Sequence, residues 1–169
     1  MKKGETIIMS VFAGLGKTTV GNKYSNVCDL QSSPYRYDYT NIDINDYEKM
    51  KNNDSLIVNK KWPSNYIKAI KEAQKKYDII LVPSNLDIRK ILVENNMDFI
   101  FILPNMDMRE ILKKRYEDRN NNENMINEVM NYFDTWSRDQ NNYKYKIEIL
   151  SKNKYLEDFL LEKGYLENK

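Results

Sequence analysis

The stretch TIIMSVFAGLGKTTV, residues 6–20, decides the fold of this chain. It begins with an apolar run, continues into a turn that contains Gly14 and Gly16, and ends in residues suited to the first turn of a helix. The apolar run is nearly continuous rather than alternating, which is typical of a strand covered on both faces of a parallel sheet. The stretch therefore predicts a strand, a tight glycine turn and a helix in direct succession.

The turn and the start of the helix form the glycine loop, which we define as residues 13–19. Glycines allow positive φ angles and a close approach of the main chain, so several N–H groups can converge on phosphate oxygens. The helix directs its partial positive charge at the same anion, Lys17 can reach terminal phosphates, and the Thr18 hydroxyl can ligate Mg²⁺. The residues expected to bind a nucleoside triphosphate are Ala13, Gly14, Leu15, Gly16, Lys17, Thr18 and Thr19.

The loop departs from the consensus GxxxxGK(S/T) at its first glycine, where this chain has Val11. An ordinary strand-to-helix turn with a solvated lysine is therefore the alternative interpretation. The strand expected before the loop and the helix expected after it favour phosphate binding, because a phosphate-binding loop requires that context.

Further apolar runs alternate with helical patterns along the chain, which predicts a single three-layer α/β domain over residues 1–169 with a five-stranded parallel sheet flanked by helices. Residues 31–59 are polar and rich in tyrosine and asparagine, and are expected to cross the face that holds the site. The strands are expected at Thr6–Phe12, Asn26–Leu30, Tyr77–Pro83, Asp98–Leu103 and Tyr145–Leu150, and the clearest helices at Trp62–Lys76, Asn85–Asn95 and Met106–Asp118.

Composition excludes several kinds of chemistry. The chain has no histidine, which removes Ser-His-Asp and Cys-His catalysis and every metal site that needs imidazole. Its one cysteine, Cys28, forms neither an internal disulfide nor a thiolate cluster and is expected to be a buried small hydrophobe. With 27 basic and 25 acidic residues there is no global field for DNA or an anionic membrane. No stretch approaches the ~20 apolar residues that cross a bilayer, so a cytoplasmic protein is expected.

The glycine loop resembles that of the P-loop kinases of the adenylate-kinase type, in which a glycine two residues before the Gly-Lys pair is usual. It is more similar still to small nucleotide-kinase-like proteins of phages and bacteria, in which an Asp-x-x-Ser-Ser element follows the second strand. That element is matched here by Asp29-Leu30-Gln31-Ser32-Ser33. The resemblance extends over most of the chain through short matches at Trp62-Pro63-Ser64-Asn65-Tyr66, Val82-Pro83-Ser84 and the basic helix from Arg109 to Arg119.

This resemblance implies a P-loop NTPase fold with a lid around residues 106–125. The implied activity is transfer of the γ-phosphoryl of ATP, with Mg²⁺, to a nucleoside monophosphate or related nucleotide. Two alternatives stay open: a non-kinase P-loop NTPase or regulatory switch, and a nucleotide-binding module without catalysis. A kinase that acts on the 5′ end of a nucleic acid is also compatible, although a nucleotide acceptor is preferred.

Positive charge for the transferred phosphoryl group is expected from the basic helix. Arg115 and Arg119 are spaced i, i+4 and share a face, and guanidinium groups grip phosphate in a bidentate way. Together with Lys17 they are the expected catalytic residues, in preference to Arg109. The alternative is a solvated basic face whose arginines pair with Glu110 and Glu117.

The acceptor and the metal are expected near the carboxyl ends of the second and third strands. Asp29 would orient the acceptor or hold a water molecule of the Mg²⁺ shell, but an aspartate before a loop is also commonly a cap. Ser32, Ser33 and Ser84 are the other expected substrate residues. The third strand carries no acid at its end until Asp87, so hydrolysis by a polarised water is less well supported than phosphoryl transfer.

Three tyrosines alternate along the polar stretch that follows Ser33, namely Tyr35, Tyr37 and Tyr39. Such residues can stack on the base of an acceptor or flank a nucleic-acid end. They can equally cover the rim of the hydrophobic core, and the sequence leaves both interpretations open.

Overall fold

A computed structural model describes residues 5–40, 56–136 and 145–167 of the chain. Its centre is a five-stranded, all-parallel sheet with the strand order β2-β3-β1-β4-β5. The strands are β1 (Ile7–Val11), β2 (Val27–Asp29), β3 (Ile79–Pro83), β4 (Phe99–Pro104) and β5 (Lys146–Leu150). Each lies inside or within one residue of a range expected from the apolar runs.

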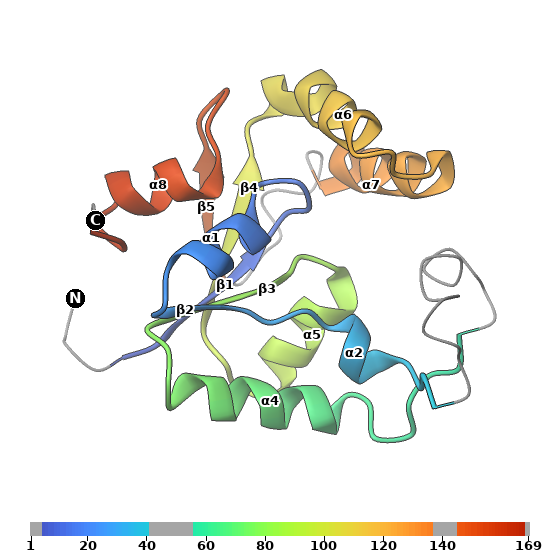
Figure 1. The fold of residues 1–169 in the computed structure, drawn as a ribbon, viewed down its shortest axis with the longest axis vertical. Helices are drawn as coiled ribbons and strands as arrows, with labels where there is room; N and C mark the ends of the chain where they lie inside the picture. The colour runs from blue at the N-terminus through green and yellow to red at the C-terminus, as the bar shows by residue number, and fades with distance from the viewer. Residues whose placement is uncertain (1–4, 41–55, 137–144, 168–169) are drawn as a thin grey trace.

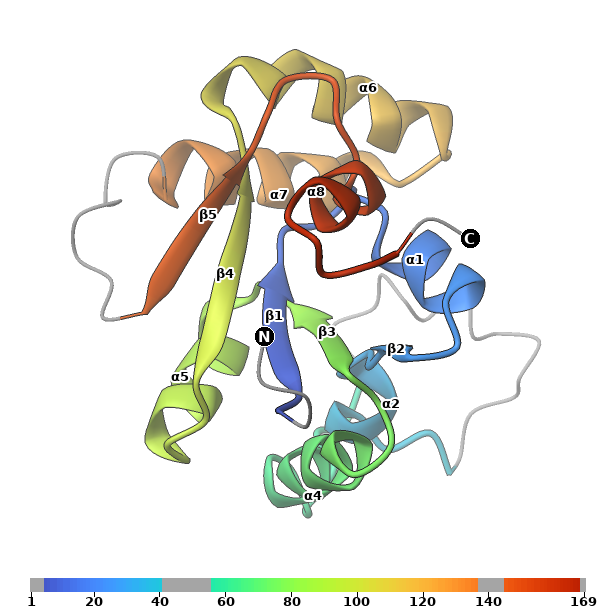
Figure 2. The same ribbon diagram turned by 90° about the vertical axis from the view of Figure 1, so that its left-hand side faces the viewer.

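Helices cover both faces of the sheet, as Figures 1 and 2 show. Helices α1 (Lys17–Lys23) and α8 (Leu156–Glu162) lie on one face, and α4 (Ser64–Gln74) and α5 (Leu86–Glu94) lie on the other. Helices α6 (Arg109–Asp118) and α7 (Glu123–Trp136) lie beyond the carboxyl ends of the strands. The predicted three-layer α/β fold with a five-stranded parallel sheet is confirmed.

The central strands form the core because both of their faces are covered. In β1 the side chains from Ile8 to Val11 are at most 2% exposed, and β3 and β4 are buried over most of their lengths. Ser10 is the polar residue in this layer, and its hydroxyl donates to the Pro83 carbonyl at 3.2 Å. Burial on both faces explains why these runs are apolar without alternation.

The carboxyl end of β1 is a point where the chain changes direction across the sheet. From β1 the chain passes through α1 to β2, beyond β3, whereas from β3 it passes through α5 to β4 on the other side of β1. In open α/β sheets the crevice at such a switch point is the usual place for a ligand. The residues that follow Val11 therefore occupy the position where this fold can best accommodate one.

The helices differ from expectation mainly at their ends. The helix expected over Trp62–Lys76 begins at Ser64, and the one expected over Met106–Asp118 is divided into a 3₁₀ turn, η2 (Met106–Met108), and α6. Of the polar stretch 31–59, the described parts form the short helix α2 (Ser33–Arg36) and an antiparallel bridge between Tyr37 and Val58. The intervening residues 41–55 lie outside the described part. Within the described residues, no helix is long and apolar enough to cross a membrane.

Candidate functional site

The glycine loop connects the end of β1 to the start of α1. Both of its glycines have a left-handed backbone, with φ of 76° at Gly14 and 101° at Gly16. Val11 is still part of β1, where it pairs with Pro83 and Ile102 and is fully buried. A glycine is not needed at position 11 because the turn begins two residues later.

The main-chain amides of the glycine loop are free to bind an anion. Over residues 13–19, no main-chain N–H donates a hydrogen bond to any group in the described part of the chain. The first N–H groups of a helix have no intrahelical acceptor, and a series of such unpaired amide donors can bind an anion. Helix α1 adds its amino-terminal partial charge at the same place.

Lys17 begins α1 and directs a charge into the same region. Its side chain is partly buried, and within the described residues its ammonium group makes no hydrogen bond or ion pair. Burial lowers the pKa of Lys17 from its ordinary value of 10.5, nearby Asp29 opposes that change, and nearby Arg119 adds to it. The arrangement places a cation that forms no ion pair within the described residues beside a row of unpaired amides, and an anionic ligand would stabilise both.

Thr18 is paired with an acid from the second strand. Its hydroxyl donates to Oδ2 of Asp29 at 2.8 Å, and Gln31 donates to the same oxygen. The other oxygen of Asp29, Oδ1, is buried and has no hydrogen-bond partner in the described part. Gly21 permits this approach of α1 to β2, because a Cβ at that position would lie 2.8 Å from the Cβ of Asp29. The carboxylate nearest to Thr18 therefore comes from the end of β2.

Arg115 of α6 stacks on the ring of Tyr155, which lies beside the glycine loop. Its guanidinium carbon lies 3.9 Å from the ring centroid of Tyr155, and that ring is itself 3.6 Å from where a Cβ of Gly16 would be. Its Nη1 atom is buried and makes no hydrogen bond within the described residues. A guanidinium that is stacked but not satisfied by a carboxylate remains able to grip an anion.

Arg119 and Arg109 differ sharply from each other. Arg119 lines a pocket of about 360 Å³ beside the loop, and its other lining residues are Gly16, Thr19, Val20, Tyr155, Glu157 and Asp158. Arg109 instead binds both carboxylate oxygens of Asp134 at 2.8 and 2.9 Å and also pairs with Glu110. These acids raise the pKa of Arg109 and satisfy its donors. The structure therefore brings Arg115 and Arg119 to the loop and commits Arg109 to a bridge between α6 and α7.

The three serines lie at the expected strand ends but make different contacts. Ser84 is 6% exposed and follows β3 beside the loop, where its carbonyl accepts from Arg89 and from the Tyr132 hydroxyl. Ser32 is buried at the start of α2, and Ser33 is exposed. Within the described part no hydrogen bond joins the side chain of any of the three to the glycine loop. Their assignment to substrate stays a prediction.

A second arginine site, not expected from the sequence, lies beyond Asp29. Arg36 of α2 forms an ion pair with Asp87 at the start of α5, and its guanidinium lies 5.7 Å from the Trp62 ring. The Nε atom of Arg36 is buried without a hydrogen-bond partner among the described residues.

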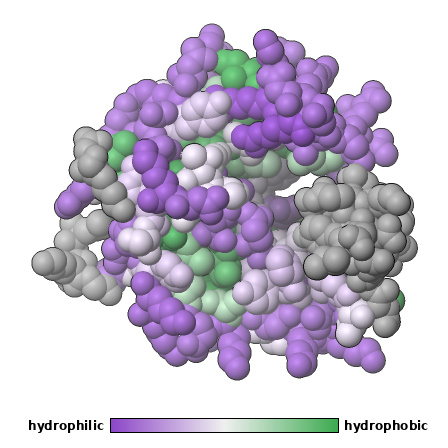
Figure 3. Space-filling model, in the orientation of Figure 1, coloured by the Kyte–Doolittle hydropathy of each residue, from purple (hydrophilic) through white to green (hydrophobic). Residues whose placement is uncertain are grey.

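In the view of Figure 3 the surface is hollowed below α6 and α7, between them and the segment around α2 and α5.

The alternating tyrosines after Ser33 are engaged within the protein. The Tyr35 ring packs on Tyr66 with centroids 5.4 Å apart, and the rings of Tyr37 and Tyr39 meet edge to face at 6.4 Å. Trp62 also stacks on Tyr66, with ring centroids 5.6 Å apart. These contacts favour the packing interpretation for Tyr35, and the guanidinium of Arg36 lies 5.6 Å from the Tyr37 ring.

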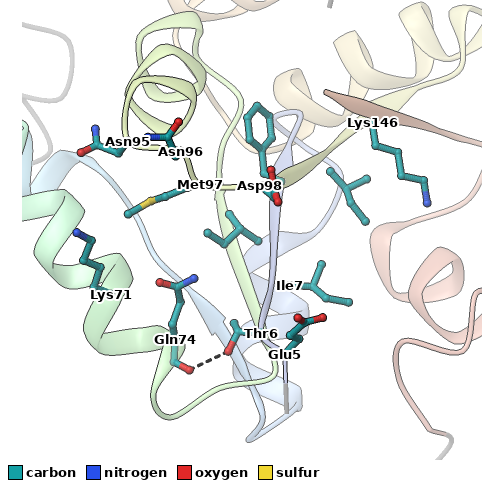
Figure 4. A pocket seen from close by; sticks show the side chains of 13 residues that line it. Glu5, Thr6, Ile7, Lys71, Gln74, Asn95, Asn96, Met97, Asp98 and Lys146 are labelled. Carbon is teal, nitrogen blue, oxygen red and sulfur yellow. Dashed lines mark hydrogen bonds between the residues drawn. The ribbon is translucent and has the colours of Figure 1, made fainter. Parts of the chain in front are cut away.

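Another hollow lies at the opposite edge of the sheet, away from the glycine loop. It measures about 640 Å³ and is formed at the amino ends of β1 and β4. Figure 4 shows Lys71 and Lys146 on opposite sides of it, and the Thr6 hydroxyl is already bound to the Gln74 carbonyl at 2.8 Å. Because ligands of parallel sheets bind outside the carboxyl ends, we assign the functional site to the glycine loop.

Gly14 provides a test of the geometry of the loop. A Cβ at this position would lie 2.8 Å from Cε1 of Tyr116, and its φ is unfavourable for any other residue. We expect Gly14→Ala to lower the free energy of unfolding by roughly 1–3 kcal/mol and to weaken the binding of Mg·ATP by about tenfold. Denaturant unfolding and calorimetric titration would measure the two effects.

The matched control for this change is Gly164→Ala. Gly164 has a similar φ of 70°, but a Cβ there would have nothing within 4 Å. We expect it to cost only the left-handed strain, about 1 kcal/mol, and to leave Mg·ATP binding unchanged. Equal binding by both variants and the unchanged protein would show that Gly14 does not shape a phosphate site.

No model of a known protein family matches the sequence, and no curated protein matches it significantly. In the described ranges, no three His, Cys, Asp or Glu side chains gather where a metal ion could be held by protein ligands alone. The function must therefore be inferred from the chemistry of the site.

Proposed function

We propose that the protein is an ATP-dependent phosphotransferase that moves the γ-phosphoryl group of ATP to a nucleoside monophosphate or a related nucleotide. The observation that carries this proposal is the row of unpaired amides over residues 13–19, beside the ammonium group of Lys17, which forms no ion pair within the described residues. A di- or triphosphate tail supplies the acceptor oxygens and the negative charge that this arrangement lacks.

The site fits Mg·ATP as the phosphoryl donor. The amides of the loop would bind the phosphate oxygens, and the pocket between Arg119 and Tyr155 lies beside Gly16 and Thr19, where the nucleoside would extend. A metal would be held by the Thr18 hydroxyl and by the phosphates, with the unpartnered Oδ1 of Asp29 accepting from a metal-bound water. Magnesium would supply neutralisation of the charge that develops on the phosphate oxygens.

Phosphoryl transfer requires positioning and positive charge more than covalent participation by the protein. Lys17 and Arg115 would stabilise charge on the transferred group, and Arg119 would hold the donor from the other side of Gly16. The acceptor would enter the hollow below α6 and α7, toward which the ends of β2 and β3 are directed. Arg36, with its buried unpaired Nε, is suited to an anionic group on that acceptor.

A screen of acceptors tests the proposal directly. Purified protein would be incubated with γ-labelled ATP, Mg²⁺ and each ribo- and deoxynucleoside monophosphate in turn, and the labelled diphosphate would be separated by chromatography. We expect at least one acceptor to be labelled. Release of labelled phosphate without any acceptor would favour an NTPase or switch, and tight ATP binding without turnover would favour a binding module.

Arg115 and Arg109 form a matched pair of arginines on one helix. We expect Arg115→Ala to lower the rate of phosphoryl transfer by at least tenfold, because it removes a charge-assisted bond to the phosphate. Arg109→Ala should leave the rate unchanged, since its donors are committed to Asp134 and Glu110. Steady-state rates at saturating ATP and acceptor would measure both. Equal losses in the two variants would mean that the helix contributes only general positive charge.

A further inference from the structure

Two carbonyl groups of the glycine loop are held by donors that lie outside it. The carbonyl of Ala13 accepts from the hydroxyl of Tyr116 at 2.7 Å, and the carbonyl of Leu15 accepts from the main-chain N–H of Leu156 at 2.8 Å. In a trans peptide unit the C=O and the following N–H point in opposite directions. The N–H of Gly14 is therefore turned away from α6, and the N–H of Gly16 is turned away from the start of α8.

The Leu15 carbonyl is fixed by the main chain, whereas the Ala13 carbonyl depends on a side chain. The peptide between Ala13 and Gly14 precedes a glycine, and a glycine offers little resistance to rotation of that plane. A rotated plane would turn the Ala13 carbonyl oxygen toward a bound anion and withdraw the N–H of Gly14. A contact that prevents the rotation is therefore needed if this amide is to serve as a donor.

Tyr116 is well placed to supply that contact. It is 1% exposed, and its ring covers Gly14 so closely that a Cβ there would lie 2.8 Å from Cε1 and 2.9 Å from the hydroxyl oxygen. Leu112 and Tyr116 are the buried residues of α6, and Met108 just before the helix is buried as well, so the ring is anchored in the core. Burial raises the pKa of the Tyr116 phenol, which keeps the hydroxyl protonated as a donor.

We propose that Tyr116 is a positioning residue of the phosphate site, whose hydroxyl fixes the Ala13–Gly14 peptide with the N–H of Gly14 turned toward the phosphate tail. The inference rests on the proposed function in one respect, namely that a phosphate tail occupies the loop. Tyr116 touches no phosphate itself and acts through the peptide that it holds. Helix α6 and the glycine loop are thereby joined by a hydrogen bond between residues 103 positions apart.

The test is Tyr116→Phe, which removes the hydroxyl and keeps the ring over Gly14. Calorimetric titration would use two probes, Mg·ATP and inorganic triphosphate with magnesium. We expect both to bind about tenfold more weakly, because one donor to the anion is no longer held in place. The KM for ATP should rise by a similar factor while the KM for the acceptor stays unchanged. In ¹⁵N–¹H spectra the Gly14 resonance should shift less on addition of Mg·ATP than it does in the unchanged protein.

The matched control is Tyr66→Phe. Tyr66 is fully buried and its hydroxyl donates to the Leu30 carbonyl at 2.8 Å, so the chemical change and the burial are the same. This variant should be destabilised to a similar degree without any change in affinity for either probe. Replacement of Tyr116 by 4-aminophenylalanine keeps a donor at the same place and should restore affinity, which guards against a general defect of folding.

The outcomes separate this inference from the proposed function. If the unchanged protein binds both probes and Tyr116→Phe binds them equally well, the hydroxyl is only structural and the inference fails alone. Weaker binding of ATP with unchanged binding of triphosphate would also overturn it, because the ring would then contact the nucleoside. Failure of the unchanged protein to bind either probe would remove both proposals together.

Discussion

Lys17→Ala is expected to lower phosphoryl transfer from ATP by roughly a thousandfold, because removal of one preorganised charge at a reacting centre costs about 10²–10³ in rate. The ammonium is partly buried and lies beside the unpaired amides of the loop; burial has the largest effect in lowering its pKa, Asp29 opposes that effect and Arg119 adds to it. An anion bound by the amides would stabilise the charged form of this group. Initial rates with γ-labelled ATP at saturating acceptor would measure the loss.

The same features predict that the fold survives the change. Lys17 makes no hydrogen bond or ion pair within the described residues, so its removal breaks neither kind of bond, and it relieves the burial of a charge, which outweighs the attraction of Asp29. We expect the thermal midpoint of the apo protein to stay level or to rise. Lys75→Ala is the control, because that lysine directly follows α4 on the other face of the sheet, is exposed and pairs with Glu72. A transfer rate that survives Lys17→Ala would mean that the loop does not hold the donor.

The sheet was predictable from the sequence because its information is local. The apolar runs predicted both ends of each of the five strands to within two residues. Gly14, Gly16 and Lys17 predicted the loop between β1 and α1. The order of the strands was not predictable. The strand order depends on which face of the sheet each connecting helix covers. The periodicity of a helix predicts which of its sides is apolar, but it does not indicate the face of the sheet that this side will cover.

The site was predictable only in part, because the sequence indicates local features but not the contacts between distant elements. Asp29 and Thr18 were both expected near a metal, but their direct hydrogen bond depends on how closely α1 approaches β2 at Gly21. Arg109 and Arg115 look alike in sequence, and the structure separates them because Asp134, which satisfies Arg109, comes from α7. Pairings between distant helices leave no local signal.

The aromatic residues of the site were missed altogether. Tyr116 follows Leu112 at i, i+4, and this spacing predicts a buried side chain without indicating that it covers Gly14. Tyr155 lies in a polar stretch, and nothing near it in sequence indicates its stacking with Arg115. Tyr116 and Tyr155 both lie beside the glycine loop although each follows it by about 100 residues or more in the sequence, so only the folded chain could reveal these contacts.

Asp29→Asn is expected to lower the transfer rate by about a hundredfold, in the range found for residues that orient metal ligands. The amide keeps an oxygen that can accept from Thr18, so the change removes charge with little change of shape. The concentration of Mg²⁺ that gives half the maximal rate should rise by about tenfold. Binding of ATP without metal should be level or stronger, because a negative charge beside the phosphates is lost. Rates across a series of Mg²⁺ concentrations and metal-free titrations would measure these effects.

The kinetic constants distinguish the roles that Asp29 could have. If Asp29 instead orients the acceptor, Asp29→Asn would raise the KM for the acceptor and leave the dependence of the rate on Mg²⁺ unchanged. If Asp29 only caps the loop after β2, the variant would lower the free energy of unfolding and leave both kinetic properties unchanged. Asp78→Asn is the matched control, because Asp78 lies at the amino end of β3 and accepts from Asn26 far from the loop. The contact with Thr18 and the buried, unpartnered Oδ1 both favour the metal, since a water bound to Mg²⁺ would complete the hydrogen bonding of that oxygen.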